Sequence, residues 1–374
     1  MAELLKNIYN YDSLRECALN VKLVYPSFQV DEFLKSILDE SWDGLELKAR
    51  GRKITMSLRK YLPEDYGEAL DIIDKVVEKY SSGELGYPVG FVVGFPLGAS
   101  FPDFVEVYGR DDENWDLSMK ALERYTPYWS AEFAVRPFIV DHEERMMAQM
   151  YAWSKHENEY VRRLASEGCR PQLPWAIALT KYKEDPAPIF PILEQLKSDP
   201  SPIVRNSVAN NLNDISKTNP DLIIKTAKEW YGSHEYTDWI VKHGCRTLLK
   251  KGNRDVLAVF GLDDVTSTYV GEFELSEKAI SIGEDITFSF ALSVEKATKV
   301  RLEYGIDYVK SSGKRNRKIF KISEISLKAN ENKVYVRKHS FADVSTRKHY
   351  PGIHSITLIV NGMERGTLDF ELKC

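Results

Sequence analysis

Three acidic residues stand among aromatic and basic residues in the middle of the chain. Glu132 lies in the segment YWSAEFAVRPF, whose aromatic residues are not the expected surroundings of a solvated acid. Glu167 follows Arg163 by four residues, a spacing that places both side chains on one face of a helix. Asp214 ends a further amphipathic segment. Carboxylates in partly apolar surroundings suit acid–base or electrostatic catalysis, so these three are candidate catalytic residues.

A structural explanation of the same residues stays open at this point. Glu167 and Asp214 would then be ion-pair partners of nearby arginines, and Trp175, in PQLPW, would belong to the core. Most tryptophans and most paired acids in proteins are structural. The residue types alone do not choose between the two interpretations.

The spacing of the metal-binding residue types predicts no metal site. The four cysteines (Cys17, Cys169, Cys245, Cys374) never form C-x-x-C, and the seven histidines never form H-x-x-x-H. Cysteines that are far apart in the sequence are typical of free thiols in a reducing compartment. The sequence has no long uncharged apolar run, and its start, MAELLKNIYNYDSLRE, lacks the apolar core of a signal peptide. We therefore expect a cytoplasmic protein that uses no metal or other cofactor and has no membrane partner.

The formal net charge of −5 conceals a gradient along the chain. Residues 1–154 hold 17 Lys/Arg against 27 Asp/Glu, residues 155–254 hold 16 against 12, and residues 299–348 hold 14 against 5. Two basic stretches on an acidic protein favour one polyanion held by two parts of the chain. The alternative is that both stretches are solvated faces.

The elements that must position these residues are helical from residue 1 to about 260. Helical patterns occur at residues 114–123, 129–151, 157–167, 174–181, 187–197, 202–216, 220–231 and 236–251. The segment 88–104, rich in glycine and proline, is typical of a connector. In the helix 202–216, Ser201 is expected to cap the first turn and Pro202 to fill the first position. Its buried stripe is expected to be Val204, Val208, Leu212 and Ile215.

Similar helical units recur along this region. They are EYVRRLASEG (159–168), SPIVRNSVANNLND (201–214) and TDWIVKHGCRTLLK (237–250), each with a valine before a basic residue. The intervals of 43 and 37 residues between these valines lie in the range of HEAT-type repeats. Such repeats stack into a superhelix whose concave face carries residues from successive helices.

After about residue 275 the pattern changes to short alternating strands. They lie at residues 286–294, 299–304, 318–323 and 354–360, with turn residues such as Ser312-Gly313 and Asn361-Gly362 between them. Several strands in about 100 residues predict an immunoglobulin-like sandwich. The predicted fold is therefore an all-α HEAT-like-repeat superhelix over residues 1–260, followed by a small all-β immunoglobulin-like sandwich over residues 275–374.

Several motifs in this order resemble the AlkC/AlkD DNA alkylation repair family of HEAT-like DNA glycosylases, and most closely its AlkC branch. They are VRRLASEGCRPQLPW, SPIVRNSVANNLNDISK and WIVKHGCRTLLKKG, together with LELKARGRKITMSLRKYLPEDY and WSAEFAVRPF. The segments IDYVKSSGKRNRKIFK and STRKHYPGIHSITLIVNG resemble the immunoglobulin-like domain that part of that branch carries. The resemblance covers nearly the whole chain.

The resemblance implies a glycosylase that hydrolyses the N-glycosidic bond of alkylated, cationic N3-methyl bases in base excision repair. It implies that Glu132, Glu167 and Asp214 are the catalytic acids and that Trp175 and Trp239 contact the lesion. Fixed carboxylates stabilise the oxocarbenium character of the sugar, a role we expect first of Glu167 and then of Asp214. Glu132 would hold the lesion or order the acids. No lysine falls at a matched catalytic position, so a monofunctional enzyme is expected, and the resemblance implies no conventional base flipping.

The expected partner is double-stranded DNA that contains alkylated bases. DNA contacts are expected from Arg162, Arg163, Arg170, Arg205, Lys217, Lys242 and Arg246, and from Lys314, Arg315, Arg317 and Lys318 in the sandwich. We expect a monomer with no obligatory protein partner. Two alternatives use the same helical stack: a non-catalytic scaffold that binds a protein, and a DNA-binding relative without activity. Convergence of the three acids and Trp175 on one cleft would argue against both.

Overall fold

The protein divides into two compact units. The computed structural model describes residues 5–84, 97–264, 266–344 and 347–374. The first unit comprises Met1–Asn219 and His234–Ile240, and the second comprises Pro220–Ser233 and Val241–Cys374. Of the predicted connector, residues 88–96 lie outside the described residues, and residues 100–104 begin a helix. Across the described ranges, no helix is long and apolar enough to cross a membrane.

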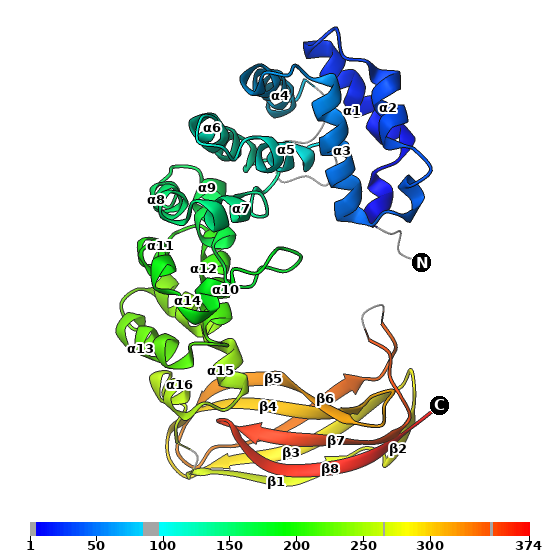
Figure 1. The fold of residues 1–374 in the computed structure, drawn as a ribbon. Helices are drawn as coiled ribbons and strands as arrows, with labels where there is room; N and C mark the ends of the chain where they lie inside the picture. The colour runs from blue at the N-terminus through cyan, green and yellow to red at the C-terminus, as the bar shows by residue number, and fades with distance from the viewer. Residues whose placement is uncertain (1–4, 85–96, 265, 345–346) are drawn as a thin grey trace. The chain divides into compact units, whose positions relative to one another are not determined.

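The first unit is built from helices that follow one another as a stack (Figure 1). Its helices are α1 (Tyr11–Val24), α2 (Val30–Ile37), α3 (Leu47–Tyr61), α4 (Tyr66–Ser81), α5 (Ser100–Tyr108), α6 (Trp115–Tyr125), α7 (Val135–Asp141), α8 (Glu143–Trp153), α9 (Glu159–Gly168), α10 (Thr180–Glu184), α11 (Phe190–Leu196) and α12 (Pro202–Ile215), with 3-10 turns η1 (Leu5–Ile8), η2 (Trp42–Gly44) and η3 (Ala187–Ile189). Helices α3 and α5, α8 and α9, and α9 and α12 are packed pairs. The predicted helix 129–151 is instead two helices, α7 and α8, which meet at His142.

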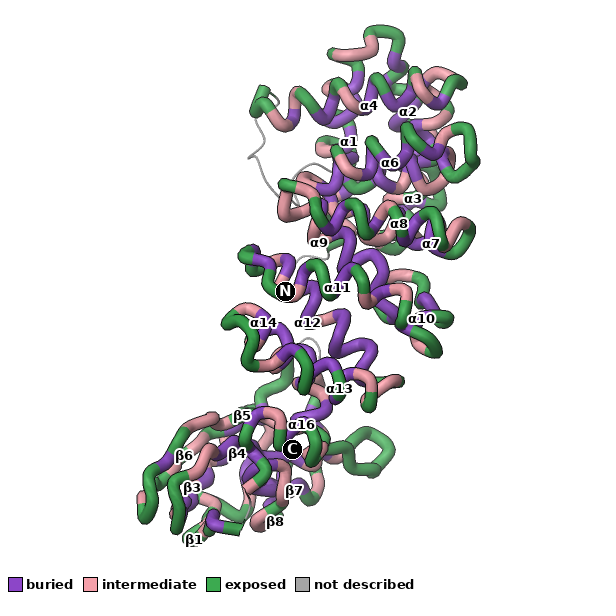
Figure 2. The backbone as a smooth tube through the Cα atoms, turned by 90° about the vertical axis from the view of Figure 1, so that its left-hand side faces the viewer, coloured by how far each residue is buried: buried purple, intermediate pink, exposed green. Residues whose placement is uncertain are grey.

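Helix α12 forms for the reasons that its sequence indicates. Pro202 occupies the first position, and the predicted stripe of Val204, Val208, Leu212 and Ile215 is buried (Figure 2). Ser201 is the N-cap residue, but its side chain makes no capping hydrogen bond. Its hydroxyl donates instead to the carboxylate of Glu159, a charged and therefore stronger acceptor. The capping prediction was wrong, and the residue instead ties α12 to α9.

The predicted helix 174–181 was also wrong, because most of it is a loop. Only its end is helical, in the short α10. Trp175 has a φ of 64°, in the left-handed region that a non-glycine residue rarely adopts and that an α-helix excludes. The loop between α9 and α10 is closed by a hydrogen bond from Leu179 N to Pro171 O at 3.1 Å. It therefore presents Trp175 outside any helix.

The second unit contains the last helices and the described strands. The helices are α13 (Pro220–Trp230), α15 (Arg246–Lys250) and α16 (Arg254–Val259), while α14 (Glu235–Gly244) has residues in both units. The strands are β1 (Thr268–Leu275), β2 (Ala279–Ser281), β3 (Asp285–Val294), β4 (Thr298–Val309), β5 (Arg315–Leu327), β6 (Asn332–Ser340), β7 (Gly352–Val360) and β8 (Met363–Lys373). They form one sheet of order β1-β3-β6 and another of order β2-β8-β7-β4-β5.

The two sheets enclose one hydrophobic core, as the sequence predicted for a sandwich. Phe288 and Phe290 from the first sheet and Ile306 and Ile356 from the second are buried in the same cluster. The strands alternate between buried and more exposed residues most regularly in β3. The predicted turn Asn361-Gly362 joins β7 to β8, and both residues have positive φ, as a type I′ hairpin turn requires.

The sandwich begins earlier than residue 275, the expected boundary. Strand β1 starts at Thr268, but its register shifts between Gly271 and Glu274. A bulge of this kind interrupts the alternation by which a strand is found in a sequence. The preceding helices belong to the same compact unit: Lys299 Nζ donates to Phe260 O at 3.0 Å.

Candidate active site

Glu167 lies in the last turn of α9, and its side chain is 7% exposed. Oε1 accepts a hydrogen bond from Arg170 Nη1 at 2.5 Å, and Oε2 accepts one from Ser207 Oγ on α12 at 2.6 Å. Because both carboxylate oxygens have a partner, the group is held in one orientation. Its orientation thus depends on the packing of α9 against α12.

Asp214, near the C-terminal end of α12, is joined to Glu167 through Arg170. Its Oδ2 lies 2.9 Å from Arg170 Nε and 2.8 Å from Nη2, and its Oδ1 accepts from Lys217 Nζ at 2.8 Å. The sequence assigned Arg170 to DNA. Its side chain is 9% exposed and its guanidinium lies between two carboxylates, so we reassign it to the site itself.

Glu132 enters the same arrangement through Arg163. Its Oε2 lies 2.8 Å from Arg163 Nη2 and 2.8 Å from Ser130 Oγ. Arg163 Nη2 is also 3.9 Å from Glu167 Oε1, and its Nη1 donates to Ser130 at 3.1 Å. The structure therefore brings the three predicted acids together. We call Glu132, Glu167, Asp214, Arg163, Arg170 and Lys217 the acid cluster.

The acid cluster contains three carboxylates and three basic side chains, and this balance supports part of each interpretation left open by the sequence. The acids are paired with arginines, as a structural role requires, and they also converge, as catalysis requires. Fixed carboxylates of this kind can face a developing positive charge without reorganising. Cys169 follows α9 directly, but burial raises the pKa of its thiol to about 12, so it is no nucleophile. In the part of the chain that the structure describes, no group of His, Cys, Asp and Glu is placed to hold a metal ion.

Trp175 is not a core residue, because its side chain is 73% exposed. It lines a pocket of about 510 Å³ together with Phe133 and Ser130. Lys48 donates to Trp175 O and lies 4.6 Å from the centre of the Phe133 ring. Ser130 lines this pocket and also bonds Glu132, so this serine links the pocket to the acid cluster. The other predicted lesion contact, Trp239, is 43% exposed on α14, a helix that carries none of the three acids.

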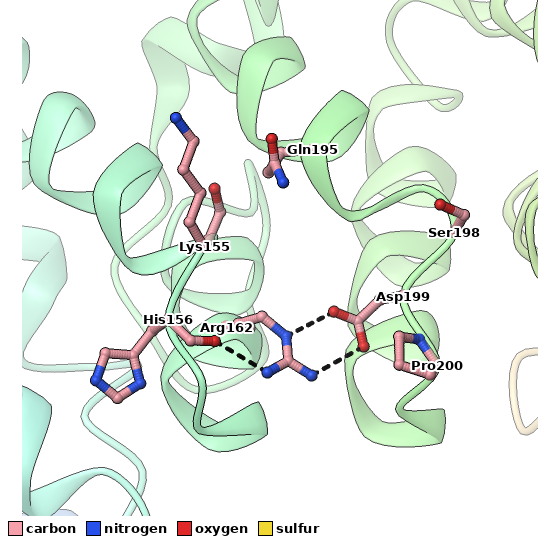
Figure 3. A pocket seen from close by; sticks show the side chains of 8 residues that line it. Lys155, His156, Arg162, Gln195, Ser198, Asp199 and Pro200 are labelled. Atoms are coloured by element: carbon pink, nitrogen blue, oxygen red, sulfur yellow. Dashed lines mark hydrogen bonds and ion pairs between the residues drawn. The ribbon is translucent and has the colours of Figure 1, made fainter.

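The predicted DNA contacts of the first unit have different surroundings. Arg162 borders a second pocket of about 440 Å³, where Asp199 holds its guanidinium at 2.6 Å and the His156 carbonyl accepts at 2.9 Å (Figure 3). It is therefore a structural ion pair and not an available DNA contact. Arg205 lies 4.2 Å from the ring centre of Tyr236 and donates to a backbone carbonyl.

The predicted DNA contacts of the second unit also fall into two classes. Lys242 pairs with Glu324, and Arg317 pairs with both Asp307 and Glu364. Arg246 Nη1 donates to His243 O at 2.8 Å, and Arg315 donates twice to Ile353 O. Lys314 and Lys318 lie on the same exposed β4–β5 hairpin as Arg315 and Arg317, but among the described residues no carboxylate lies within ion-pair distance of either ammonium group. These two lysines are the best placed for an external polyanion.

The sequence did not predict the two serines of the site, Ser207 and Ser130. Ser207 precedes Asp214 by seven residues, which places both on one face of α12, and this spacing was an available signal. Ser130 lies two residues before Glu132, and no pattern in the sequence distinguishes it.

Comparisons with known proteins agree with this architecture. Residues 110–249 match the family described as DNA alkylation repair enzyme, and residues 269–374 match the C-terminal Ig-like domain of YhaZ. The chain is 46% identical to the uncharacterized protein YhaZ of Bacillus subtilis (strain 168), covering 98% of this chain and 99% of the relative.

Among solved structures, the Pseudomonas fluorescens alkylpurine DNA glycosylase AlkC, bound to DNA that contains an abasic site analog, is similar over its whole length. The sequence identity is 36%, all of both chains is covered, and the TM-score is 0.91. Both units of the present chain therefore have their counterparts in one relative. The chain belongs to the AlkC/AlkD family of DNA alkylation repair enzymes, in the AlkC branch with a C-terminal immunoglobulin-like domain.

Proposed function

We propose that this protein is a DNA glycosylase that hydrolyses the N-glycosidic bond of alkylated bases in DNA. The observation that carries the proposal is the convergence of Glu132, Glu167 and Asp214, each held by hydrogen bonds to neighbouring side chains. Relatedness over the full length to an alkylpurine DNA glycosylase supports it.

In the proposed reaction, the acids act on the sugar and not on the departing base. A base methylated on N3 is cationic and leaves readily, and the sugar gains oxocarbenium character as the bond breaks. Glu167, fixed at both oxygens, supplies negative charge to that state, and Asp214 supports it or the attacking water. Glu132 orders the cluster through Arg163.

Trp175 accounts for the proposed preference for cationic lesions. An exposed indole ring attracts a cation through its π face, an effect of about 0.5–2 kcal/mol that a neutral base does not gain. Because the side chain is on the surface of a loop, it can meet a lesion in distorted DNA. The proposal therefore includes no conventional base flipping.

We further propose a monofunctional enzyme that forms no Schiff base with the sugar. Lys217 is the lysine of the acid cluster, and its ammonium is hydrogen-bonded to Asp214 at 2.8 Å. The prediction is that borohydride traps no covalent protein–DNA adduct. DNA would be held mainly through its phosphates by exposed basic side chains such as Lys314 and Lys318, which fits an enzyme that must act in any sequence.

The direct test is release of free base from methylated duplex DNA by the purified protein, with the E167Q variant as matched control. We expect chromatography to detect 3-methyladenine with the wild type and much less with the variant. Binding of abasic-site DNA without any release of base would contradict the proposal. That outcome would assign the chain to the non-catalytic DNA-binding alternative.

A further inference from the structure

Arg136 is a fully buried arginine that the sequence did not single out, and it lies near the start of α7. Burial lowers the pKa of its guanidinium to about 10, so the group remains charged at neutral pH. A buried charge is costly unless its N–H groups find acceptors, so the acceptors indicate what the residue does.

The acceptors of Arg136 are three backbone carbonyls from two segments. Nη1 donates to Gly168 O and to Arg170 O, each at 2.9 Å, and Nε donates to Ile177 O at 2.7 Å. Gly168 and Arg170 lie at the C-terminal end of α9, where carbonyls lack partners in the helix and the helix dipole favours a cation. Ile177 lies in the loop that carries Trp175. One guanidinium thus joins the end of α9 to this loop.

The first segment carries the centre of the acid cluster. Gly168 directly follows Glu167, and the side chain of Arg170 bonds both Glu167 and Asp214. Fixing the backbone at Gly168 and Arg170 therefore fixes the points from which the two side chains project. The contact of Arg136 with this segment is entirely through the backbone, so Arg136 itself does not touch the carboxylates.

The second segment is the loop between α9 and α10, and packing does not hold the side chain of its Trp175 in place. Trp175 is 73% exposed and has an unfavourable positive φ, so backbone anchors must maintain its position. Two side chains supply such anchors: Lys48 at Trp175 O and Arg136 at Ile177 O. Lys48 is exposed, whereas Arg136 is fully buried.

We propose that Arg136 is a positioning residue that sets the placement of Trp175 relative to the acid cluster. The inference rests on the proposed function for the roles of Glu167 and Trp175. It assigns to Arg136 an effect on the rate of excision and not on the binding of DNA, because the buried side chain cannot reach a phosphate.

The test compares Arg136→Met with Arg50→Met. Arg50 is a matched control: it is buried at 6% exposure, and it also donates to backbone carbonyls, Lys6 O at 3.0 Å and Leu45 O at 3.2 Å. At temperatures where both variants are folded, single-turnover excision by R136M should fall by about 10²-fold, the cost of a displacement of about 1 Å. R50M should excise at the wild-type rate, and both should bind abasic-site DNA normally.

Two further measurements keep the outcome decisive if R136M folds poorly. R136K, which retains a charge and part of the hydrogen bonding, should give an intermediate rate. Millimolar guanidinium should restore part of the activity of R136A and none to R50A, which a general loss of stability does not predict. A wild-type rate in a folded R136M or R136K, or an equal loss in the R50 and R136 variants, would overturn the inference.

The fluorescence of Trp175 separates this inference from the proposed function. Its emission is obtained as the difference between each protein and the same protein with Trp175→Phe. The emission should change in R136M, or in R136K if R136M does not fold, and stay unchanged in R50M. If the wild type releases no base, the proposed function fails, and this readout alone decides whether Arg136 positions the loop.

Discussion

The two units each contain a buried polar cluster, and the two clusters are built on opposite principles. The acid cluster of the first unit consists of charges, each held by an oppositely charged side chain. Besides the buried ion pair of Arg301 with Glu303, the sandwich of the second unit buries a cluster of neutral rings. His339 bridges the hydroxyls of Tyr304 (2.9 Å) and Tyr308 (2.6 Å), and His349 and His354 pack beside Tyr308.

The two clusters differ in the role of their buried polar groups. Burial lowers the pKa of His339 to about 4, with a further contribution from the charge of Arg347, so this ring is neutral at physiological pH. A neutral cluster of this kind serves packing. Buried ion pairs often contribute little net stability, because desolvation offsets their attraction. The acid cluster is therefore better explained by chemistry than by stability.

The largest effect should come from Glu167→Gln, which keeps the shape of the side chain but removes its charge. Single-turnover excision of 3-methyladenine should slow by about 10²–10⁴-fold, the range typical of one lost electrostatic or acid–base catalyst. DNA affinity should not fall, because removing a negative charge does not weaken attraction to phosphate. Ser207→Ala, which removes a hydrogen bond to the same carboxylate and retains its charge, should slow the reaction much less.

The same comparison extends to Asp214→Asn. It should also reduce the rate and not the affinity, and the double variant with Glu167→Gln should be less than additive if both acids serve one transition state. If Glu167→Gln excised at the wild-type rate, the charge would be a structural partner of Arg170, and Glu132 would become the leading candidate.

The histidine cluster should produce a pH effect on stability, on the order of 3 kcal/mol, and none on chemistry near neutral pH. The pKa of His339 is about 4 in the folded state and about 6.5 when unfolded, so the unfolded chain binds more protons between these values. The free energy of unfolding of the second unit should therefore fall as pH drops from about 6.5 to about 4. The free energy of unfolding, measured by denaturant melts, should fall more steeply with decreasing pH in the wild type than in His339→Gln over this window. The same pH dependence in both proteins would contradict the assignment of the effect to His339.

Trp175→Ala should have a smaller and selective effect. Excision of cationic lesions should slow by about 2- to 30-fold, which corresponds to the loss of about 0.5–2 kcal/mol of cation–π attraction. A neutral alkylated base, where it is excised at all, should be affected less. Trp239→Ala provides the comparison on α14, and equal effects of both variants on all lesions would argue for a general weakening of DNA binding.

The exposed surface of the sandwich, in contrast to its interior, should contribute only to DNA binding. Replacing Lys314 and Lys318 together by alanine should reduce the slope of log affinity against log salt by about 1.8, at about 0.9 for each phosphate that a lysine no longer neutralises. Excision at saturating enzyme should stay near the wild-type rate. The matched control is Lys328→Ala with Lys333→Ala in the same sandwich, and an equal change in slope there would show a diffuse charge effect.

Short-range signals predicted the elements well. Pro202 and the apolar stripe of α12 specified a helix, and Asn361-Gly362 specified a hairpin, because the interactions concerned join residues a few positions apart. Where local signals failed, a neighbour in space had changed the outcome. Ser201 bonds Glu159 across 42 residues in place of its own helix, and the bulge in β1 concealed the start of the sandwich.

The sequence predicted which residues belong to the candidate site but not which of them pair with one another. The residue types and the family resemblance named Glu132, Glu167, Asp214 and Trp175, and they assigned Arg162 and Arg170 to DNA. Whether an arginine faces solvent or a carboxylate depends on which helices pack together, and this is not contained in its immediate sequence.

The sequence by itself determined the order of helices and strands, the charge gradient and the set of acids, because these follow from composition and local periodicity. The tertiary structure decided that Arg170 joins Glu167 to Asp214, 44 residues away from it, and that Arg136 anchors the loop of Trp175. Both arrangements arise where α9 meets its neighbours. Contacts between residues so far apart in the chain exist only once those elements have packed.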